Sequence, residues 1–552
     1  MKIRFLFLLA VCLVIGLVLR CAHLGRRPMH NDEGVNAIKF GELWEHGTYK
    51  YDPREYHGPS LHYATLAFES LTGAPDLDRF TETRLRAVTV AFGLGLILLL
   101  PLVTDGLGRR ALAWAALFTA VSPAMVFYSG YYIHEMLLVF FTLLTLGSGW
   151  RYWRTRKIGW ALLTGAGLGL MHGTKETFLI TLIAAALASV LNQIWNRLLD
   201  ASGLPVKAPP LKWKHLAAAL AIWAGVWGLL FSSFGSNWPG LLDSFRTYLP
   251  WFKRAGGDSP HLHPWTFYLH RLLWFHPGKG PVWTEALIFA LAAIGAAAGF
   301  IRKRLGRASA SFVRFLALYT FALTAAYSLL AYKTPWCALS FWQGMILLAG
   351  VGAAVLLRSV GARNLVRRNA RPEERVDQGS SAAGVRGSLR TKVRAGVCLR
   401  LGLVALFVLG AGHLAWQSWQ STGLCAADKR NPYVYAQTSP ELLDLVRQVE
   451  ALAQVSPQGH QMLIKVMSFE GDCWPLPWYL RRFKQVGWWN IVPPDSFAPV
   501  MIVSSKFQAA LDENRTHIMR HEFALRPGVY VELYVELELW KAYLAKDPLR
   551  LD

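Results

Sequence analysis

The chain has 552 residues, of which 53% are hydrophobic and only 17% charged, and it contains 23 Trp. Soluble domains average about 25% charged residues, so this composition excludes an ordinary soluble protein and predicts a polytopic membrane protein. The net charge of +23 arises from 58 Lys and Arg against 35 Asp and Glu.

Long apolar runs recur along the sequence. A run of about 20 residues is long enough to cross roughly 30 Å of hydrocarbon as a helix. We expect eleven transmembrane helices, at about residues 4–22, 85–103, 111–128, 133–150, 158–172, 177–195, 216–234, 283–300, 312–331, 337–357 and 397–417. No small-residue cleavage site follows Arg20, so the first run predicts a retained helix and not a signal peptide.

The segment from Met171 to Glu176 interrupts one apolar stretch. A single helix through it would bury Lys175 and Glu176 near mid-bilayer, at a cost of about 2.5–3.5 kcal/mol each. Two short helices joined by an outer turn avoid this cost, and they also keep the basic loop 196–215 on the inside.

Basic residues predict the orientation. With the N-terminus inside, most of the excess of Lys and Arg falls in cytoplasmic turns and in segment 358–396, whereas the opposite loops are nearly neutral. This positive-inside bias predicts a multi-pass protein of the cell (plasma or inner) membrane with a cytoplasmic N-terminus. The bias explains the high net charge, so no nucleic-acid partner is expected. Segment 358–396, rich in Arg, Gly, Ser and Ala, is expected to be a disordered cytoplasmic loop.

Titratable residues gather on the predicted extracytoplasmic side. They are His30, Asp32, Glu33, His57, His134, Glu135, His172, Lys175, Glu176 and Lys333. Each one alone is compatible with an interfacial anchor, since such residues are common at membrane boundaries. The adjacent Asp32 and Glu33 are also compatible with the acidic cap of a helix that starts near Val35. Their convergence on one side favours a shared site.

Two long outer loops, 23–84 and 235–282, flank these residues. Residues 60–72 alternate apolar and polar positions with helical period, as in a helix lying in the interface plane. Loop 235–282 is rich in Trp and His, which suit either stacking on a sugar or contact with lipid headgroups. The spacing of its His residues does not predict a structural zinc site.

Residues 418–552 are expected to form a separate extracytoplasmic α/β domain, after a transmembrane domain that spans 1–417. A helix is predicted from Ser439 to about Val455. Further elements are predicted as strands at 462–469, 500–504, 517–525 and 529–535 and as helices near 476–484, 506–514 and 537–545. Asp472 and the segment Trp474–Trp478 suit either acceptor binding or docking on the membrane domain. Cys425 and Cys473 share the outer compartment, where a disulfide is permitted but not required.

Several motifs together resemble a known family. They are Asn31-Asp32-Glu33, Tyr56-His57-Gly58-Pro59, Tyr332-Lys333-Thr334-Pro335-Trp336, Asn431-Pro432-Tyr433-Val434-Tyr435 and Trp474-Pro475-Leu476-Pro477-Trp478-Tyr479-Leu480-Arg481. The combination is similar to the flippase-activity-associated membrane proteins of archaeal N-glycosylation, which are related to protein O-mannosyltransferase-like GT-C glycosyltransferases. The resemblance covers almost the whole chain.

The resemblance implies an inverting transferase with a GT-C-like helical fold and a polyprenyl-phosphate-linked sugar donor. An acidic residue of the first loop is then the catalytic base or a metal ligand. The acceptor is left open among a glycan, a lipid and a protein. The name of the family leaves an accessory role open as well.

The residue types allow roles to be assigned within that reaction. Asp32 or Glu33 is the expected base, with the other orienting the acceptor or a divalent cation such as Mg²⁺ or Mn²⁺. Two neighbouring carboxylates are expected to raise each other's proton affinity. The donor phosphate is expected to contact cationic or proton-donating side chains, namely Lys175, Lys333, His134 and Arg84. Supporting roles are expected for His57, Glu135, Glu176 and Tyr332.

Two other functions compete with the transferase. One is a non-catalytic subunit of a lipid-linked-sugar flippase, which binds the carrier but transfers nothing. The other is a transporter, which is disfavoured because its charges are expected near mid-membrane on broken helices.

Overall fold

A bundle of long helices forms the larger part of the molecule. The computed structural model describes residues 2–54, 57–73, 76–199, 210–256, 261–301, 305–359 and 382–546. The bundle helices are α1 Lys2–Cys21, α4 Glu82–Leu99, α6 Arg109–Val121, α7 Pro123–Ser129, α8 Glu135–Thr155, α9 Ile158–His172, α10 Phe178–Leu199, α11 Trp213–Phe231, α15 Ala286–Ile301, α16 Ala310–Leu329, α17 Leu339–Ser359 and α19 Ala382–Thr422. The short elements η2 Leu100–Val103, α5 Thr104–Leu107 and η3 Pro335–Ala338 link them.

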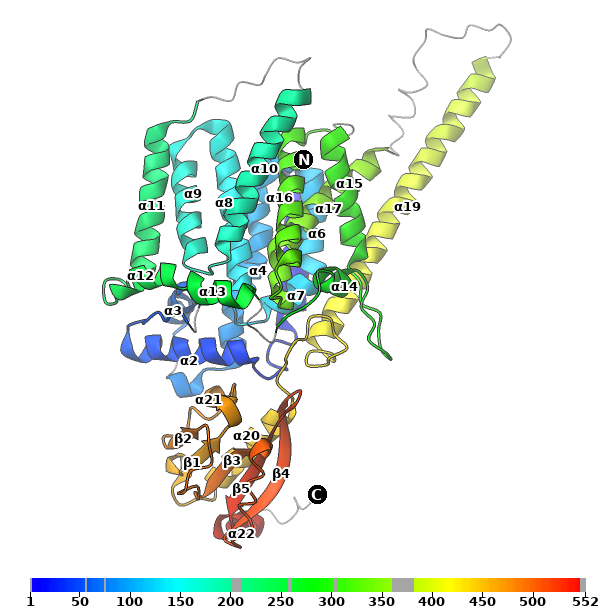
Figure 1. Cartoon of the computed structure of the whole chain (residues 1–552). Helices are drawn as coiled ribbons and strands as arrows, with labels where there is room; N and C mark the ends of the chain where they lie inside the picture. Colours follow the sequence, from blue (N-terminus) through cyan, green and yellow to red (C-terminus); the bar gives the residue numbers. More distant parts are fainter. Residues whose placement is uncertain are drawn as a thin grey trace.

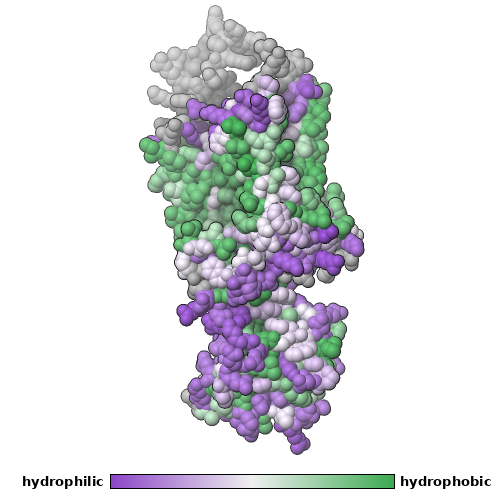
Figure 2. Space-filling view, turned by 90° about the vertical axis from the view of Figure 1, so that its left-hand side faces the viewer, coloured by the Kyte–Doolittle hydropathy of each residue, from purple (hydrophilic) through white to green (hydrophobic). Residues whose placement is uncertain are grey.

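Each of the eleven predicted spans coincides with one of these helices or, for α6 and α7, with a pair bent by 56°. Within the described ranges, seven helices are long and apolar enough to cross a membrane, and the bent pair makes an eighth if it is one span. The helices α9 and α15 are apolar but shorter. Figure 2 shows hydrophobic residues covering this face of the bundle, above a mostly hydrophilic lower half.

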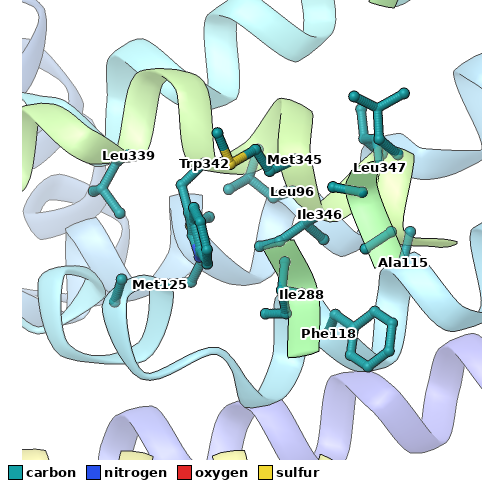
Figure 3. Packing of buried hydrophobic residues seen from close by; sticks show 14 of the residues in the cluster. Leu96, Ala115, Phe118, Met125, Ile288, Leu339, Trp342, Met345, Ile346 and Leu347 are labelled. Atoms are coloured by element: carbon teal, nitrogen blue, oxygen red, sulfur yellow. The ribbon is translucent and has the colours of Figure 1, made fainter. Parts of the chain in front are cut away.

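Helix α17 is the centre of the bundle. Trp342, Met345 and Ile346 on this helix pack among apolar side chains from α4, α6, α7 and α15, as Figure 3 shows. Glycines let the helices approach closely: a Cβ at Gly352 would lie 1.9 Å from the Leu291 carbonyl oxygen of α15. This dense centre fixes the helix ends from which the candidate site is built.

A layer of short helices covers one end of the bundle. These are α2 Asn31–His46, α3 Ser60–Thr72, η1 Leu77–Arg79, α12 Pro239–Arg246, α13 Tyr248–Ala255 and α14 Phe267–Leu273. Helices α2, α12 and α13 run across the bundle axis in Figure 1. The helix predicted at 60–72 is present, and the turn predicted at Lys175–Glu176 joins α9 to α10 at this same end.

The C-terminal domain is a small α/β layer structure. Its elements are α20 Glu441–Ala453, η4 Gly459–Gln461, β1 Ile464–Met467, η5 Phe469–Gly471, α21 Leu476–Tyr479, β2 Val486–Trp489, β3 Val500–Ser504, η6 Ser505–Phe507, β4 His517–Arg526, β5 Val529–Glu536 and α22 Leu537–Lys546. The sheet order is β2-β1-β3-β5-β4; β1 pairs in parallel with β2 and β3, and β5 runs antiparallel to β3 and β4.

Several local predictions were wrong. The helix predicted near 506–514 is only the single turn Ser505–Phe507, and the one near 476–484 ends at Tyr479. Strand β2 was not predicted, because four residues with a glycine carry no clear alternation. The expected disordered loop 358–396 is helical from Ala382, where α19 begins, while 360–381 lie outside the described residues. Cys425 and Cys473 are both free, so they do not form the disulfide considered above.

The C-terminal domain docks on α2. The backbone N–H of Met29 donates to the Tyr479 hydroxyl at 2.8 Å, and Trp478 Nε1 donates to Glu82 at 2.9 Å. A Cβ at Gly34 would lie 2.7 Å from the Pro475 Cβ, so only glycine allows this approach. The segment Trp474–Trp478 therefore docks on the membrane domain, as one of its two predicted interpretations requires. It places α2 between the bundle and the C-terminal domain (Figure 1).

Candidate active site

The candidate site begins at the first turn of α2. His30 is the N-cap: its Nδ1 accepts the N–H of Asp32 at 3.1 Å, and its own N–H donates to Glu33 Oε2 at 2.9 Å. This reciprocal arrangement is a capping box, with His in place of the usual Ser or Thr. It starts the helix at Asn31, four residues earlier than the alternative that placed the start near Val35.

Glu33 is fully buried between two arginines. Its two oxygens accept from Arg86 Nε at 2.7 Å and Arg86 Nη2 at 2.9 Å, and Arg27 Nη2 lies 3.2 Å from Oε1. The Tyr132 N–H donates to Oε1 at 2.9 Å. Burial alone raises the pKa of Glu33, but Arg86 and Arg27 outweigh it and hold the pKa well below its usual range. The expected mutual increase in proton affinity therefore does not apply to Glu33, and a carboxylate so fully engaged is poorly suited to be a base or a metal ligand.

Asp32, one position along, faces open space. Its side chain is 46% exposed. It lines two cavities that share Asn31, Asp32, Tyr332 and Trp336. We name them by their other walls: the membrane-side cavity lies against the bundle end, and the domain-side cavity reaches the C-terminal domain. Asp32 is thus on the partition between them.

The membrane-side cavity, of about 230 Å³, collects most of the predicted residues. Those in its lining are Asp32, His57, His134, Glu135, Glu176 and Tyr332. They come from α2, the loop before α3, the start of α8, the α9–α10 turn and the loop after α16. The prediction that residues from separate outer loops converge is therefore matched by the structure.

Three members of two acid–base pairs, His57, Glu176 and Glu135, line this cavity. His57 Nδ1 lies 2.9 Å from Glu176 Oε1, and Lys175 Nζ donates to Glu135 Oε1. Burial alone raises the pKa of Glu176, but His57 and Lys175 outweigh it and lower that pKa. Burial alone lowers the pKa of Lys175, whereas Glu135 raises it well above its usual value. Lys175 lines a small adjoining cavity of about 40 Å³ that also touches His57 and Tyr332.

His134 is buried and neutral. Its Nε2 lies 2.9 Å from the carbonyl oxygen of Gly58, which can only accept, so Nε2 carries the proton. Burial lowers the pKa of His134 well below its ordinary value, and the nearby His57, His62 and Lys175 lower it further. A neutral imidazole here can donate a hydrogen bond but does not supply the positive charge expected for a phosphate contact.

The domain-side cavity, of about 320 Å³, lies beyond Asp32. His30, Trp336 and Tyr435 line it from the membrane domain and the segment that follows α19, and Arg526 lines it from β4. Arg526 forms an ion pair with Asp472 and donates from Nη1 to the Trp474 carbonyl oxygen at 3.1 Å. Its contribution from a strand of the C-terminal domain was not predicted.

Two predicted phosphate contacts lie elsewhere. Lys333 is buried and donates from Nζ to the carbonyl oxygens of His263, at 2.8 Å, and Leu330. It thereby joins the loop before α14 to the loop after α16. Arg84 forms an ion pair with Glu69 of α3. Neither side chain lines the two cavities that Asp32 shares, because each is directed into packing between elements.

Sequence reasoning missed several cavity residues. Arg54 lies in the membrane-side cavity, as do Thr247, Pro250 and Trp251 from the junction of α12 and α13. A single arginine in a polar loop has no local signal that separates it from a solvated charge. The Trp-rich composition of loop 235–282 was the only signal for Trp251.

The predicted metal role does not suit Glu33. Both oxygens of Glu33 accept hydrogen bonds from arginines and backbone N–H groups. In the part of the chain that the structure describes, no group of three or more His, Cys, Asp or Glu side chains is arranged to hold a metal ion.

Comparison with known proteins identifies the fold. Residues 63–235, from α3 to just beyond α11, match the family described as dolichyl-phosphate-mannose-protein mannosyltransferase. This segment includes His134, Glu135, Lys175 and Glu176. No curated protein sequence matches the chain significantly.

Solved structures extend the similarity to nearly the whole chain. ArnT from Cupriavidus metallidurans in the apo state matches with a TM-score of 0.58 and 15% identity, over 97% of this chain and 98% of ArnT. The same protein bound to undecaprenyl phosphate gives 0.56 and 16% identity over the same shares. An oligosaccharyltransferase from Archaeoglobus fulgidus matches with 0.51 and 13%, over 88% of this chain and 64% of that one. The predicted GT-C-like fold is confirmed, and segment 63–235 is similar to protein O-mannosyltransferases, as the resemblance implied.

Proposed function

We propose that this GT-C-fold membrane protein is a glycosyltransferase that moves a sugar from a polyprenyl-phosphate-linked donor to an acceptor hydroxyl on the extracytoplasmic face. The observation that carries the proposal is the position of Asp32. It is a partly exposed carboxylate on the partition between two cavities, with acid–base pairs beside one and a separate domain beside the other. A donor and an acceptor that enter from opposite sides meet at this residue.

The chemistry follows from that position. Asp32 accepts the proton of the acceptor hydroxyl as its oxygen forms a bond to the anomeric carbon. The bond between that carbon and the phosphate oxygen breaks, and the electron pair leaves with the polyprenyl phosphate. Attack from the face opposite to the leaving group inverts the anomeric configuration. Proton removal by a positioned base contributes about 10²–10⁴-fold to such reactions.

The membrane-side cavity suits the donor phosphate. Arg54 lines this cavity, and Lys175 supplies positive charge from the small adjoining cavity. Glu135 fixes Lys175 in place, so the cation is oriented before the donor arrives. All of these residues lie at the end of the bundle, as expected for contacts with the phosphate of a membrane-anchored lipid.

The comparisons and the charge distribution support this assignment. The matching structure of ArnT holds undecaprenyl phosphate, and the matching family is described by a lipid-phosphate-mannose donor. The basic turn 151–157 lies at the bundle end opposite to the cavities, as expected for a cytoplasmic N-terminus and an extracytoplasmic C-terminal domain.

Replacement of Asp32 by Asn tests the proposal. In cells that depend on the variant, we expect extracytoplasmic glycan products to fall by at least 100-fold while the purified full-length protein still binds polyprenyl phosphate. The control is Asp76→Asn, which removes an exposed carboxylate of the same outer loop and is expected to change neither measurement. Unchanged glycans with Asp32→Asn would refute catalysis and favour the non-catalytic accessory role.

A further inference from the structure

The domain-side cavity has a rigid aromatic wall. The rings of His30 and Trp336 lie 5.3 Å apart at 73°, and those of Trp336 and Tyr435 lie 6.0 Å apart at 79°. The Tyr435 hydroxyl contacts His261 Nδ1 and His263 Nε2, both at 2.8 Å. These contacts hold the Tyr435 ring in place before any ligand binds.

The same residues are tied to the candidate base. His30 Nε2 lies 3.1 Å from the Tyr435 carbonyl oxygen, so this nitrogen donates, and Nδ1 accepts from the N–H of Asp32. The imidazole therefore links the aromatic wall to the first turn of α2. The position of Asp32 depends directly on the segment that carries Tyr435.

The domain-side cavity also contains a compensated charge. Arg526 is at the end of β4, where the pairing with β5 is irregular between Ala524 and Arg526. Such irregularities redirect side chains, and Figure 1 shows the tip of the β4–β5 hairpin reaching toward the bundle. Asp472 pairs with Arg526; burial lowers the pKa of the Arg526 guanidinium, and the charge of Asp32 opposes that shift.

This charge pattern selects among acceptor classes. Asp32 and Arg526 both line this cavity, and Arg526 is already paired with Asp472, so an anionic acceptor would be repelled by Asp32. A neutral polyhydroxylated acceptor avoids that repulsion. Its hydroxyls can accept from Arg526 and donate to Asp32, while its apolar face packs on the rings of Trp336 and Tyr435.

We propose that the domain-side cavity binds a neutral saccharide acceptor and that Arg526 of the C-terminal domain positions it against Asp32. The proposal rests on the proposed transferase function and adds the acceptor class and a specificity residue. A volume of about 320 Å³ is at the lower end for ligand pockets, which suits the terminal one or two sugar units of a glycan.

Saturation-transfer NMR on the full-length protein in nanodiscs, with polyprenyl phosphate present, tests this binding. The probes are neutral methyl glycosides and disaccharides, their phosphorylated counterparts, and a Ser/Thr-containing peptide. We expect neutral saccharides to bind the native protein and to bind Arg526→Gln about tenfold or more weakly, because hydrogen bonds from a charged donor are lost.

Two further variants control for folding. Arg526→Lys keeps the positive charge beside Asp472 but loses the planar guanidinium with its paired N–H donors. It is therefore expected to unfold at the same temperature as the native protein and yet to bind saccharide more weakly than the native protein does. Arg520→Gln changes an arginine of the same strand that lies over Trp540, 3.8 Å from the ring centroid, and is expected to bind saccharide normally.

The outcomes separate this inference from the proposed function. Binding of only phosphorylated sugars or only the peptide would overturn it, as would unchanged saccharide binding in both Arg526 variants. A loss of polyprenyl phosphate binding in a normally folded Arg526→Lys would assign the residue to the donor and overturn it as well. Failure of the native protein to bind polyprenyl phosphate would instead count against the transferase.

Discussion

Replacement of Glu33 by Gln is expected to destabilise the fold, although Glu33 is adjacent to the candidate base. Glu33 is the shared partner of Arg86 and Arg27, and all three are buried. Gln keeps the size and one acceptor oxygen but removes the negative charge. The substitution therefore leaves two buried guanidinium groups without the carboxylate that both of them contact.

The size of the effect follows from the burial. Breaking a buried ion pair by removing one partner costs about 3–5 kcal/mol. Since about 1.4 kcal/mol is tenfold in an equilibrium constant, the unfolded population rises by roughly two to three and a half orders of magnitude. This range applies because Arg86 makes two short hydrogen bonds to Glu33, at 2.7 and 2.9 Å, with no exposed surface on either side chain.

Thermal and denaturant unfolding of the detergent-purified protein, followed by Trp fluorescence, measures the loss of stability in Glu33→Gln. The pKa of Glu33 is depressed, so its contribution is complete above its unfolded value of about 4.5 and is lost as the pH falls through the lower folded value. The difference between the native protein and Glu33→Gln is thus expected to be constant from pH 6 to 8. Asp32→Asn is expected to unfold like the native protein. If Glu33→Gln were equally stable but inactive, while Asp32→Asn stayed active, the assigned roles would be reversed.

Three further predictions concern pH, donor binding and docking. Burial lowers the pKa of His62 to about 3, so between pH 6.5 and that value only the unfolded chain takes up a proton on this residue. The free energy of unfolding therefore falls by about 1.4 kcal/mol for each pH unit of acidification. His62→Gln is expected to flatten the acid side of a plot of unfolding temperature against pH, and an unchanged slope would contradict this. Arg54→Gln is expected to weaken polyprenyl phosphate binding, measured by fluorescence titration, about two- to fivefold, and less so at high salt. Arg79→Gln, at another exposed site of the same loop, is the control and is expected to bind polyprenyl phosphate like the native protein. Gly34→Val introduces a Cβ 2.7 Å from the Pro475 Cβ, so the variant is expected to lose about 1–3 kcal/mol of stability at this contact. Proteases are then expected to release the C-terminal domain faster. A cleavage rate equal to that of the native chain would show that this contact does not hold the domain.

The helices were predictable because the bilayer imposes a length and a polarity on each span. The eleven apolar runs became helices, and the turn at Lys175–Glu176 separated α9 from α10 as the cost of buried charge required. The positions of polar side chains were less predictable. Lys333 and Arg84 share the side of the membrane with the site, but their side chains turn into packing contacts that only the tertiary structure defines.

Contacts between residues that are distant in sequence account for the remaining differences between the predicted and the observed site. Arg86 is 53 residues from Glu33, and Arg526 reaches the domain-side cavity from the last hairpin of the chain. Neither position carries a local pattern that identifies its contact. Charge counting placed the outer loops on one side, but it gave no information about which cation pairs with which acid.

The different roles of Asp32 and Glu33 follow from helix geometry. Consecutive residues of an α-helix point about 100° apart, so the side chains of Asp32 and Glu33 leave α2 in different directions. The capping box and the two arginines fix which residue turns inward, and they leave Asp32 on the face between the cavities. Docking of the C-terminal domain on α2 then supplies the second cavity wall through Arg526. The buried acid therefore sets the orientation of the helix, and that orientation gives the exposed acid access to both cavities.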